Sequence, residues 1–155
     1  IRLRNASNHV TITNSLITYS SQKGIYLADY NTSPSTLNIS NSEISNNGGI
    51  GIDCTYGYSG LVISDCNFSN NGSYPIRTYG NFADNITGTM TFTGNNPDEI
   101  FILGDNVYNG TWLDHNVPYY IDGNQSIINN EDENSLLRSS YPSRYQSSLV
   151  RQGLN

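Results

Sequence analysis

Three side chains that could recognise a ligand recur at one position of a repeating pattern. They are Tyr26, Asp53 and Arg77, separated by 53−26=27 and 77−53=24 residues. An aromatic ring can stack on a sugar, and an acid beside an arginine offers directional hydrogen bonds to hydroxyl groups. Tyr56 and Tyr79 lie close to the same positions in the sequence. All five residues are therefore candidates for carbohydrate binding.

Two other interpretations of this column stay open. An exposed Asp–Arg pair beside surface tyrosines would contribute at most ~1 kcal/mol to stability. An arginine beside an aspartate could instead assist proton abstraction in a lyase. The two histidines, His9 and His115, lie in polar turn contexts and are expected to be solvated, and no second acid pairs convincingly at glycosidase spacing. We assign no catalytic residue and favour a non-catalytic role, leaving the question of enzyme activity open.

The sequence indicates neither a metal site nor a cofactor. Calcium sites need several converging carboxylates, and the regular repeats hold only Glu43, Asp53 and Asp65. The two cysteines, Cys54 and Cys66, fall at different positions of the repeat and are not expected to stack on each other. A disulfide between them stays open, because sequence cannot supply the required geometry.

The elements that would position this column are short strands within a repeat. Two sets of isoleucines mark it, namely Ile12, Ile39 and Ile63, and Ile25, Ile52 and Ile76. Both sets show the same spacings, since 39−12=27, 63−39=24, 52−25=27 and 76−52=24. A repeat of this length with alternating apolar and polar residues predicts a solenoid, in which each coil buries its apolar face against the next. Alternation then directs the ligand-binding candidates outward, beside inward isoleucines.

Polar residues also recur at fixed positions of the repeat. Asn14, Asn41 and Asp65 follow the first strand of successive units, where stacked side chains could form a hydrogen-bonded structural ladder. Simple turn formation is an equal alternative for each of them. A second outward column of hydroxyl groups is expected along the first strand, formed by Thr13, Ser40, Ser64 and Thr93.

The repeat is carried in full by three segments, VTITNSLITYSSQKGIYL, LNISNSEISNNGGIGI and LVISDCNFSNNGSYPIRT. In their order of strand, bend and strand, the chain resembles the right-handed parallel β-helix family of pectin- and alginate-acting enzymes, phage tailspikes and bacterial and archaeal surface proteins. The resemblance covers residues 10 to 93. It implies an all-β fold, a right-handed parallel β-helix of about five coils with an irregular C-terminal tail. It implies no activity, because this fold hosts many chemistries.

The repeat loosens after Tyr79. Met90 and Phe92 are expected to form the inward pair of a fourth coil, which stretches the spacing to 92−63=29. Further on, Trp112 and Tyr120 are predicted to plug the open end of the core, since large rings need burial; sugar binding by these rings is the alternative. We expect the β-helix to occupy residues 1–125 and residues 126–155 to form an irregular tail or a partner-binding arm.

Composition restricts the partners. The chain has 155 residues, a formal net charge of −6 and a pI near 4.5, which argues against binding nucleic acid. It holds no apolar run of about 18 residues or more, so no membrane span is expected. Only 13% of the residues are charged. A surface of neutral polar groups favours an extracellular or cell-surface location and contact with glycans.

The residues Ile1–Arg4 carry no amphipathic cap, which would leave the backbone and interior of the first coil open to pairing. We expect an upstream segment of a longer protein, or another copy of the chain, to cover this end. The sequence thus predicts a non-catalytic extracellular structural or adhesive module, able to self-associate into a surface assembly or filament. The alternative is a carbohydrate-binding or carbohydrate-active β-helix of the polysaccharide lyase or hydrolase type.

Overall fold

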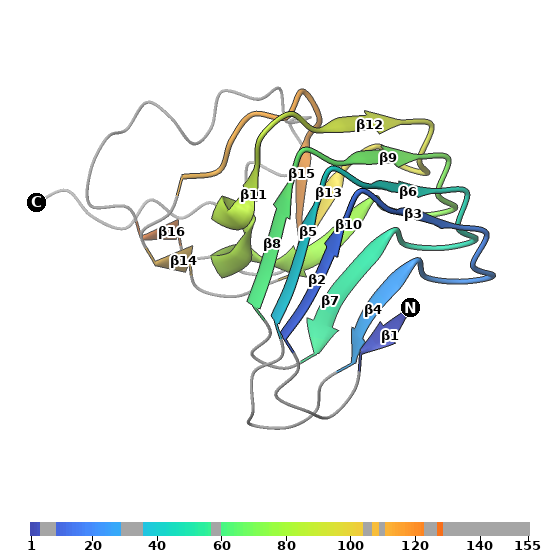
Figure 1. The fold of residues 1–155 in the computed structure, drawn as a ribbon. Coiled ribbons are helices and arrows are strands. Elements are labelled where there is room, and N and C mark those ends of the chain that lie inside the picture. The colour runs from blue at the N-terminus through green and yellow to red at the C-terminus, as the bar shows by residue number, and fades with distance from the viewer. Residues whose placement is uncertain are drawn as a thin grey trace, which may run out of the picture.

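A computed structural model shows the chain winding into stacked coils of three short strands (Figure 1). It describes residues 1–3, 9–28, 36–56, 60–103, 107–108, 111–122 and 127–128, with the backbone alone at 28, 56, 107–108 and 127–128. Strands pair in parallel with the equivalent strands of the coils before and after them. The predicted all-β parallel solenoid is confirmed.

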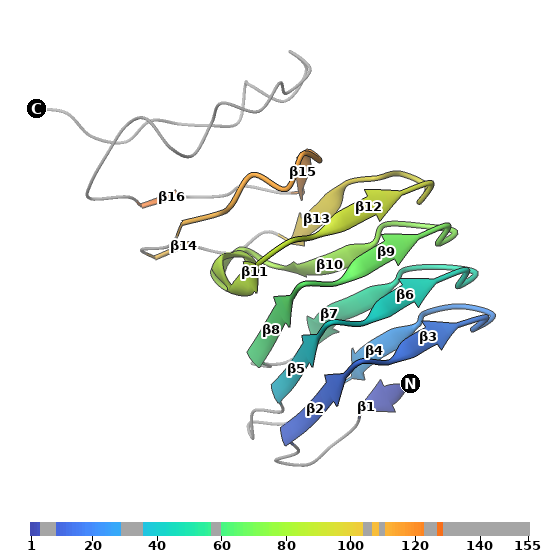
Figure 2. The same cartoon turned by 45° about the horizontal axis from the view of Figure 1, so that its top comes forward.

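One face of the solenoid is a six-stranded sheet with the order β1-β4-β7-β10-β13-β15. Its strands are β1 (Arg2–Leu3), β4 (Ile25–Ala28), β7 (Ile52–Tyr56), β10 (Ile76–Tyr79), β13 (Ile100–Leu103) and β15 (Tyr119–Asp122). It is the longest sheet along the stacking direction, and each coil contributes one strand to it (Figure 2).

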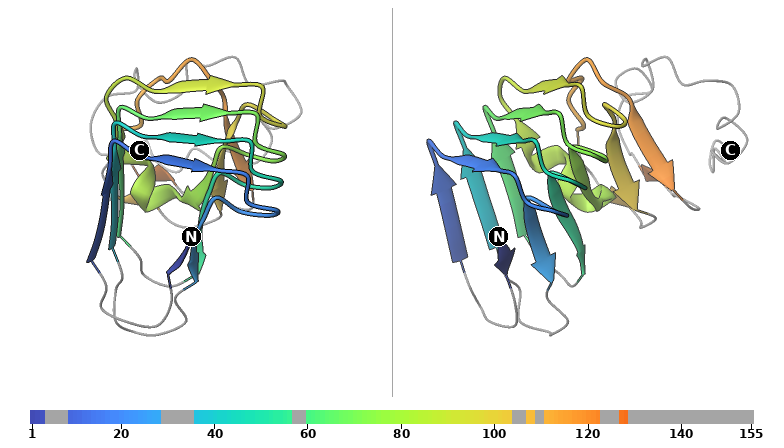
Figure 3. Two further views of the ribbon diagram at one scale, coloured as in Figure 1. Left: turned by 45° about the vertical axis from the view of Figure 1, so that its right-hand side comes forward. Right: turned by 90° about the vertical axis from the view of Figure 1, so that its right-hand side faces the viewer.

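Two four-stranded sheets complete the coils. The facing sheet contains β2 (His9–Thr13), β5 (Thr36–Ser40), β8 (Gly60–Ser64) and β11 (Ile86–Thr87). The bridging sheet contains β3 (Leu16–Thr18), β6 (Glu43–Ser45), β9 (Asn67–Ser69) and β12 (Thr91–Thr93). Viewed from the end, it spans the gap between the other two sheets (Figure 3). Two short strands, β14 (Val107–Tyr108) and β16 (Ile127–Ile128), pair separately.

Asn14, Asn41 and Asp65 make the bends between the facing and bridging sheets. Their φ angles are 48°, 48° and 53°, in the left-handed region that asparagine and aspartate tolerate better than most residues. Successive bends are joined through the backbone, because the amide of Asn14 donates to the oxygen of Ser40 and that of Asn41 to the oxygen of Ser64, each at 3.2 Å. All three side chains are exposed.

Columns of stacked apolar residues fill the interior. Ile25, Ile52, Ile76 and Ile100 pair with one another in register, and each is fully buried. Leucine, isoleucine and phenylalanine columns from the other two sheets pack against them. A coil's apolar side chains are therefore covered mainly by the equivalent side chains above and below, as expected for a solenoid.

The fourth coil corrects two expectations. Ile63 pairs with Ile86, and Phe68 pairs with Phe92, so the spacings are 86−63=23 and 92−68=24 and the repeat does not stretch. The 3₁₀ helix η1 (Gly80–Asn85) connects β10 to β11, so β11 begins earlier than the sequence pattern indicated. The hydroxyl column therefore continues from Ser64 to Thr87, whereas Thr93 pairs with Ser69 in the bridging sheet.

The described residues contain four complete coils, with β1 and β15 as additional rungs of the six-stranded sheet. This is slightly fewer than the predicted number. The regular β-helix extends at least to Asp122, and β16 lies within the segment expected to be a tail or arm. Residues 129–155, which make up nearly all of that segment, lie outside the described part of the chain.

Candidate functional site: the outer face of the six-stranded sheet

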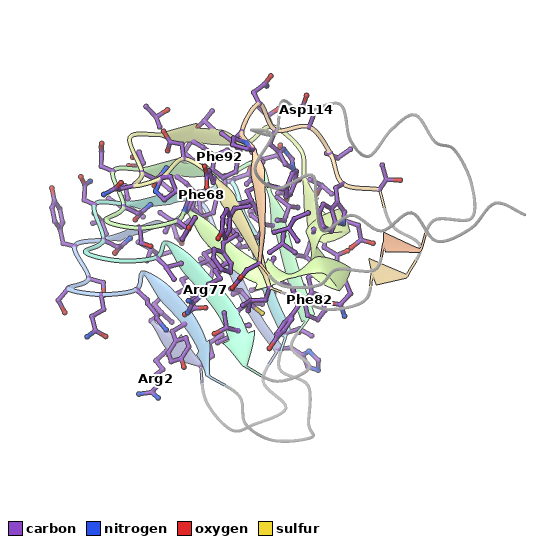
Figure 4. All side chains as sticks on the ribbon, turned by 180° about the vertical axis from the view of Figure 1, so that it is seen from behind. Arg2, Phe68, Arg77, Phe82, Phe92 and Asp114 are labelled. Atoms are coloured by element: carbon purple, nitrogen blue, oxygen red, sulfur yellow. The ribbon has the colours of Figure 1, made fainter. Side chains whose placement is uncertain are left out.

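Six outward side chains form a single row across the six-stranded sheet. Strand pairing places them in the order Arg2, Tyr26, Asp53, Arg77, Phe101 and Tyr120. We call this row the outer column. Figure 4 shows Arg2 and Arg77 on strands of this sheet. The three aligned candidates thus lie on successive strands, and the row continues with Arg2 on one side of them and with Phe101 and Tyr120 on the other.

Asp53 is the buried centre of an ion network, although it lies on the outer face. Its side chain has 0% exposure, because Arg77 and Lys23 cover it. Arg77 donates from Nε to Oδ1 at 3.0 Å and from Nη2 to Oδ2 at 2.7 Å, and Lys23 Nζ contacts Oδ2. The expectation that Asp53 faces solvent is therefore wrong: two long side chains from the coils before and after it close over a short one.

Tyr26 is enclosed by cations. Lys23 Nζ lies 3.6 Å from the centroid of its ring, and the guanidinium carbon of Arg2 lies 5.3 Å from it. Both distances fall within the range of cation–π interactions. Sequence reasoning missed Lys23 because this residue precedes β4. The alternation of inward and outward side chains, which identified the other members of the column, applies only within the strand.

A second part of the face is aromatic. Phe101 lies with its ring centroid 4.8 Å from that of Tyr74, in an edge-on arrangement, and 5.1 Å from that of Tyr120. The rings of Tyr74 and Tyr120 are 6.0 Å apart. We call these three residues the aromatic cluster. Phe101 is next to Arg77 in the register, so the cluster and the ion network are one strand apart.

The remaining candidates lie at the end of the same strands. Tyr79 donates a hydrogen bond from its hydroxyl to the backbone oxygen of Thr55 at 3.0 Å, linking β10 to β7. The side chain of Tyr56 lies outside the described residues.

This face also gathers positive charge. The lysine and arginine side chains that the structure describes are Arg2, Lys23 and Arg77, and each contacts Tyr26 or Asp53. One buried aspartate is their counter-charge here. In a chain with a net charge of −6 this is a local concentration of cations.

Comparison with known families agrees with this architecture. A family model described as "Right handed beta helix region" matches residues 1–140. The chain belongs to this right-handed β-helix family. No curated protein and no solved structure matches the chain.

A hydrogen-bonded asparagine ladder runs inside the β-helix, at a position that the sequence analysis did not identify. Asn47, Asn71 and Asn95 are buried at the turn between the bridging sheet and the six-stranded sheet. Asn47 Nδ2 donates to Asn71 Oδ1 at 2.9 Å, and Asn71 Nδ2 donates to Asn95 Oδ1 at 2.7 Å. Asp98 ends the ladder, because its carboxylate accepts from Asn95 Nδ2 at 2.7 Å. The even spacing of these asparagines, 71−47=24 and 95−71=24, was the available signal.

Glycine allows the ladder turns to stack closely. A Cβ atom on Gly72 would lie 2.4 Å from the backbone oxygen of Gly48, and one on Gly48 would lie 2.5 Å from that of Ser21. A side chain at either position would therefore push successive coils apart at the turn that carries the ladder.

Of the two residues predicted to plug the end of the core, Trp112 does so and Tyr120 does not. Trp112 packs against the core, with its ring 5.2 Å from that of Tyr119. Tyr119 is buried and pairs with Ile100, whereas Tyr120 pairs with Phe101 and lies on the outer face. Tyr120 is therefore not part of the plug, since alternation along β15 sends adjacent tyrosines to opposite sides.

His115 was expected to be solvated, but it is buried. His9 is exposed, with Nδ1 2.6 Å from the hydroxyl of Thr36.

Both cysteines are buried free thiols. Cys54 pairs with Leu27 in the six-stranded sheet, and Cys66 follows the bend at Asp65. Burial raises the pKa of Cys54 to about 12 and also raises the pKa of Cys66 above its usual value. Within the described residues, no group of three or more histidine, cysteine, aspartate or glutamate side chains is arranged to hold a metal ion.

We expect both thiols to resist modification in the folded protein. At pH 8 a thiol-specific reagent should react slowly in native buffer and rapidly in concentrated urea, because the reactive thiolate is rare and inaccessible in the native state. Mass spectrometry of the labelled protein would give the rates. Equal labelling rates in the two solvents would contradict the burial of these side chains.

Proposed function

We propose that this β-helix is a non-catalytic extracellular structural or adhesive module that contacts glycans through the outer face of its six-stranded sheet. The observation that carries the proposal is the outer column, in which an ion network and an aromatic cluster lie side by side on one rigid sheet. Binding sites built on strands hold their side chains more precisely than sites built on loops.

The dimensions of the face suit an extended polymer. Adjacent strands in a sheet lie about 4.8 Å apart, so the column from Arg2 to Tyr120 spans roughly 24 Å. Phe101 and its neighbours supply ring faces and edges for stacking on sugars. Arg77 lies one strand away and could donate hydrogen bonds to hydroxyl or acidic substituents of the same chain.

The state of Asp53 favours binding over catalysis. A general base must come within hydrogen-bond distance of the substrate proton that it removes. The Asp53 carboxylate is fully buried, and its oxygens accept from Arg77 and contact Lys23. Asp53 therefore orients the two cations. Proton transfer by Asp53 would be required only in the alternative function, a carbohydrate-active β-helix.

Two outcomes separate these candidates. Incubation with pectin, alginate and neutral glucans should leave chain length unchanged while the protein is retained by at least one of them. Shortening of any polymer, measured by size-exclusion chromatography, would favour the carbohydrate-active alternative and would identify its substrate.

Replacing Phe101 by alanine tests the contact surface. We expect about a tenfold loss of affinity for the bound polysaccharide, equivalent to about 1.4 kcal/mol, because the variant lacks the ring that would stack on a sugar. Affinity electrophoresis in gels containing the polysaccharide would measure it. Tyr19→Ala is the matched control, since Tyr19 is an aromatic residue with 81% exposure beyond the end of β3, away from the outer column. Equal losses in both variants would place binding elsewhere.

The extracellular location is part of the proposal and rests on composition. Among the described residues no helix is long and apolar enough to cross a membrane.

We also propose that a further coil stacks on the first one, supplied by an upstream segment or by another copy. The strands β1, β2 and β3 end their sheets on that side, and Ile1, Leu16 and Tyr19 are exposed there. Analytical ultracentrifugation across a concentration range would reveal self-stacking.

A further inference from the structure

The segment Thr111–Pro118 covers the last strands of two sheets without forming a strand itself. Figure 2 shows it running past β11 and β12 before it enters β15. β11 ends the facing sheet and β12 ends the bridging sheet. A strand at the end of a sheet presents backbone groups that can pair with another chain, so this segment protects an edge of the β-helix.

His115 fastens the segment to both strands. Its Nε2 atom lies 3.0 Å from the backbone oxygen of Ile86 in β11, and its ring lies 6.2 Å from that of Phe92 in β12. Because a carbonyl oxygen only accepts, Nε2 carries the proton in this contact and Nδ1 is the unprotonated nitrogen of the neutral ring. The residue as a whole is 7% exposed.

The surroundings disfavour a charged imidazole. The described strands β11 and β12 consist of isoleucine, threonine and phenylalanine and bring no titratable side chain. Asp114, next to His115, is the acid that acts on the ring, but its Oδ1 already accepts from the amide of Asn116 at 2.8 Å. Asp84 in η1 and Asp65 below Gly88 are further acids near β11, and Asp98 and Glu99 lie in the turn between β12 and β13. The hydrogen bond to Ile86 and the charge of Asp114 raise the pKa of His115, but burial has the larger effect and lowers this pKa below its usual value near 6.5.

We propose that the segment Thr111–Pro118 is an acid-releasable cap, held over β11 and β12 by neutral His115 and freed when that residue gains a proton. A histidine whose folded-state pKa is lowered binds its proton more readily in the open state. The stability that neutral His115 contributes to the closed cap is therefore complete when the pH is above the usual histidine pKa. It declines as the pH falls below that pKa. Opening would expose the edges of β11 and β12 to pairing.

The protein carries its own reporter of this motion. Trp112, the only tryptophan in the chain, belongs to the segment and packs against Tyr119. Its Nε1 atom is buried and lacks a hydrogen-bond partner within the described structure, which adds to the cost of keeping the cap closed. Tryptophan fluorescence therefore reports on the cap, and far-ultraviolet circular dichroism reports on the strands.

The experiment is an acid titration of the full chain from pH 8 to pH 4.5, compared with His115→Gln. The glutamine amide can donate to the oxygen of Ile86 but does not titrate in this range. We expect the emission of the wild-type protein to shift to longer wavelength below pH 6.5 while its circular dichroism stays constant, and we expect the variant to show no shift. An unchanged wild-type emission, an equal shift in His115→Gln, or loss of circular dichroism at the same pH would each overturn the proposal. Should the variant fail to fold at pH 8, acrylamide quenching of Trp112 in the wild-type protein decides: quenching that does not rise on acidification overturns the cap.

Discussion

Replacing Asn71 by alanine is expected to lower the free energy of unfolding by about 4 kcal/mol, because several buried groups lose their partners at once. Asn71 Oδ1 accepts from the backbone amide of Asn47 at 3.2 Å and from its side chain at 2.9 Å. Asn71 Nδ2 donates to the backbone oxygen of Ile44 at 3.0 Å and to Asn95 at 2.7 Å. Each buried group left without a partner costs about 1–3 kcal/mol.

Urea denaturation followed by circular dichroism would measure this loss, with Asn38→Ala as the control. Asn38 is also an asparagine on a central coil, but its side chain points to solvent from β5. The control should unfold at nearly the same urea concentration as the unmodified protein. Similar midpoints for Asn71→Ala and Asn38→Ala would mean that water replaces the ladder without cost and that the coils are held by apolar columns alone.

The ladder shows why part of this fold could be predicted from sequence and part could not. Inward apolar residues such as Ile39 and Ile63 are visible because alternation and spacing repeat together, and the structure pairs them as expected. Asn14 and Asn47 have the same side chain, yet one makes an exposed left-handed bend and the other lies in the core. A polar residue at a turn does not reveal from its type which side of the turn it faces, and that choice depends on the stacking of the next coil.

The fourth coil illustrates a second limit. The expected register aligned Phe92 with Ile63, whereas the structure pairs Phe92 with Phe68. Length variation in a solenoid is absorbed by the connections between sheets, here by η1 between β10 and β11. Spacing from one landmark therefore loses the register wherever a connection changes length, and a second landmark in the same coil is needed to recover it.

The candidate site was predictable in position and not in environment. The row of Tyr26, Asp53 and Arg77 follows from parity and equal spacing, and the strand register places them side by side. That Lys23 would close over both Tyr26 and Asp53 depends on how a long side chain folds back from a turn, which no periodicity describes. The consequence is energetic: an ion pair expected to be exposed is in fact centred on a buried carboxylate.

Replacing Asp53 by alanine should therefore destabilise the protein by about 2–3 kcal/mol, more than removal of an exposed acid would. Breaking a buried ion pair costs about 3–5 kcal/mol, and we expect less here because Lys23 and Arg77 retain 27% and 29% side-chain exposure and can recover part of their hydration. Arg77→Ala should also lower stability, because it removes both hydrogen bonds that the guanidinium donates to the Asp53 carboxylate. The thermal midpoints of the variants would measure these losses.

Asp122→Ala supplies the matched control for Asp53→Ala, since it removes the same charge from an exposed position at the end of the same sheet. The glycan affinities of the two variants then separate a structural role of Asp53 from a positioning role. If Asp53 orients Arg77 for a ligand, Asp53→Asn should bind more weakly than the unmodified protein, because its amide oxygen can accept only one of the two hydrogen bonds that fix the guanidinium, while its amide nitrogen can accept from neither Arg77 nor Lys23. If Asp53→Ala proves as stable as Asp122→Ala, the ion network contributes nothing to the fold. Full stability together with full affinity would leave the aromatic cluster as the part of this face that recognises a ligand.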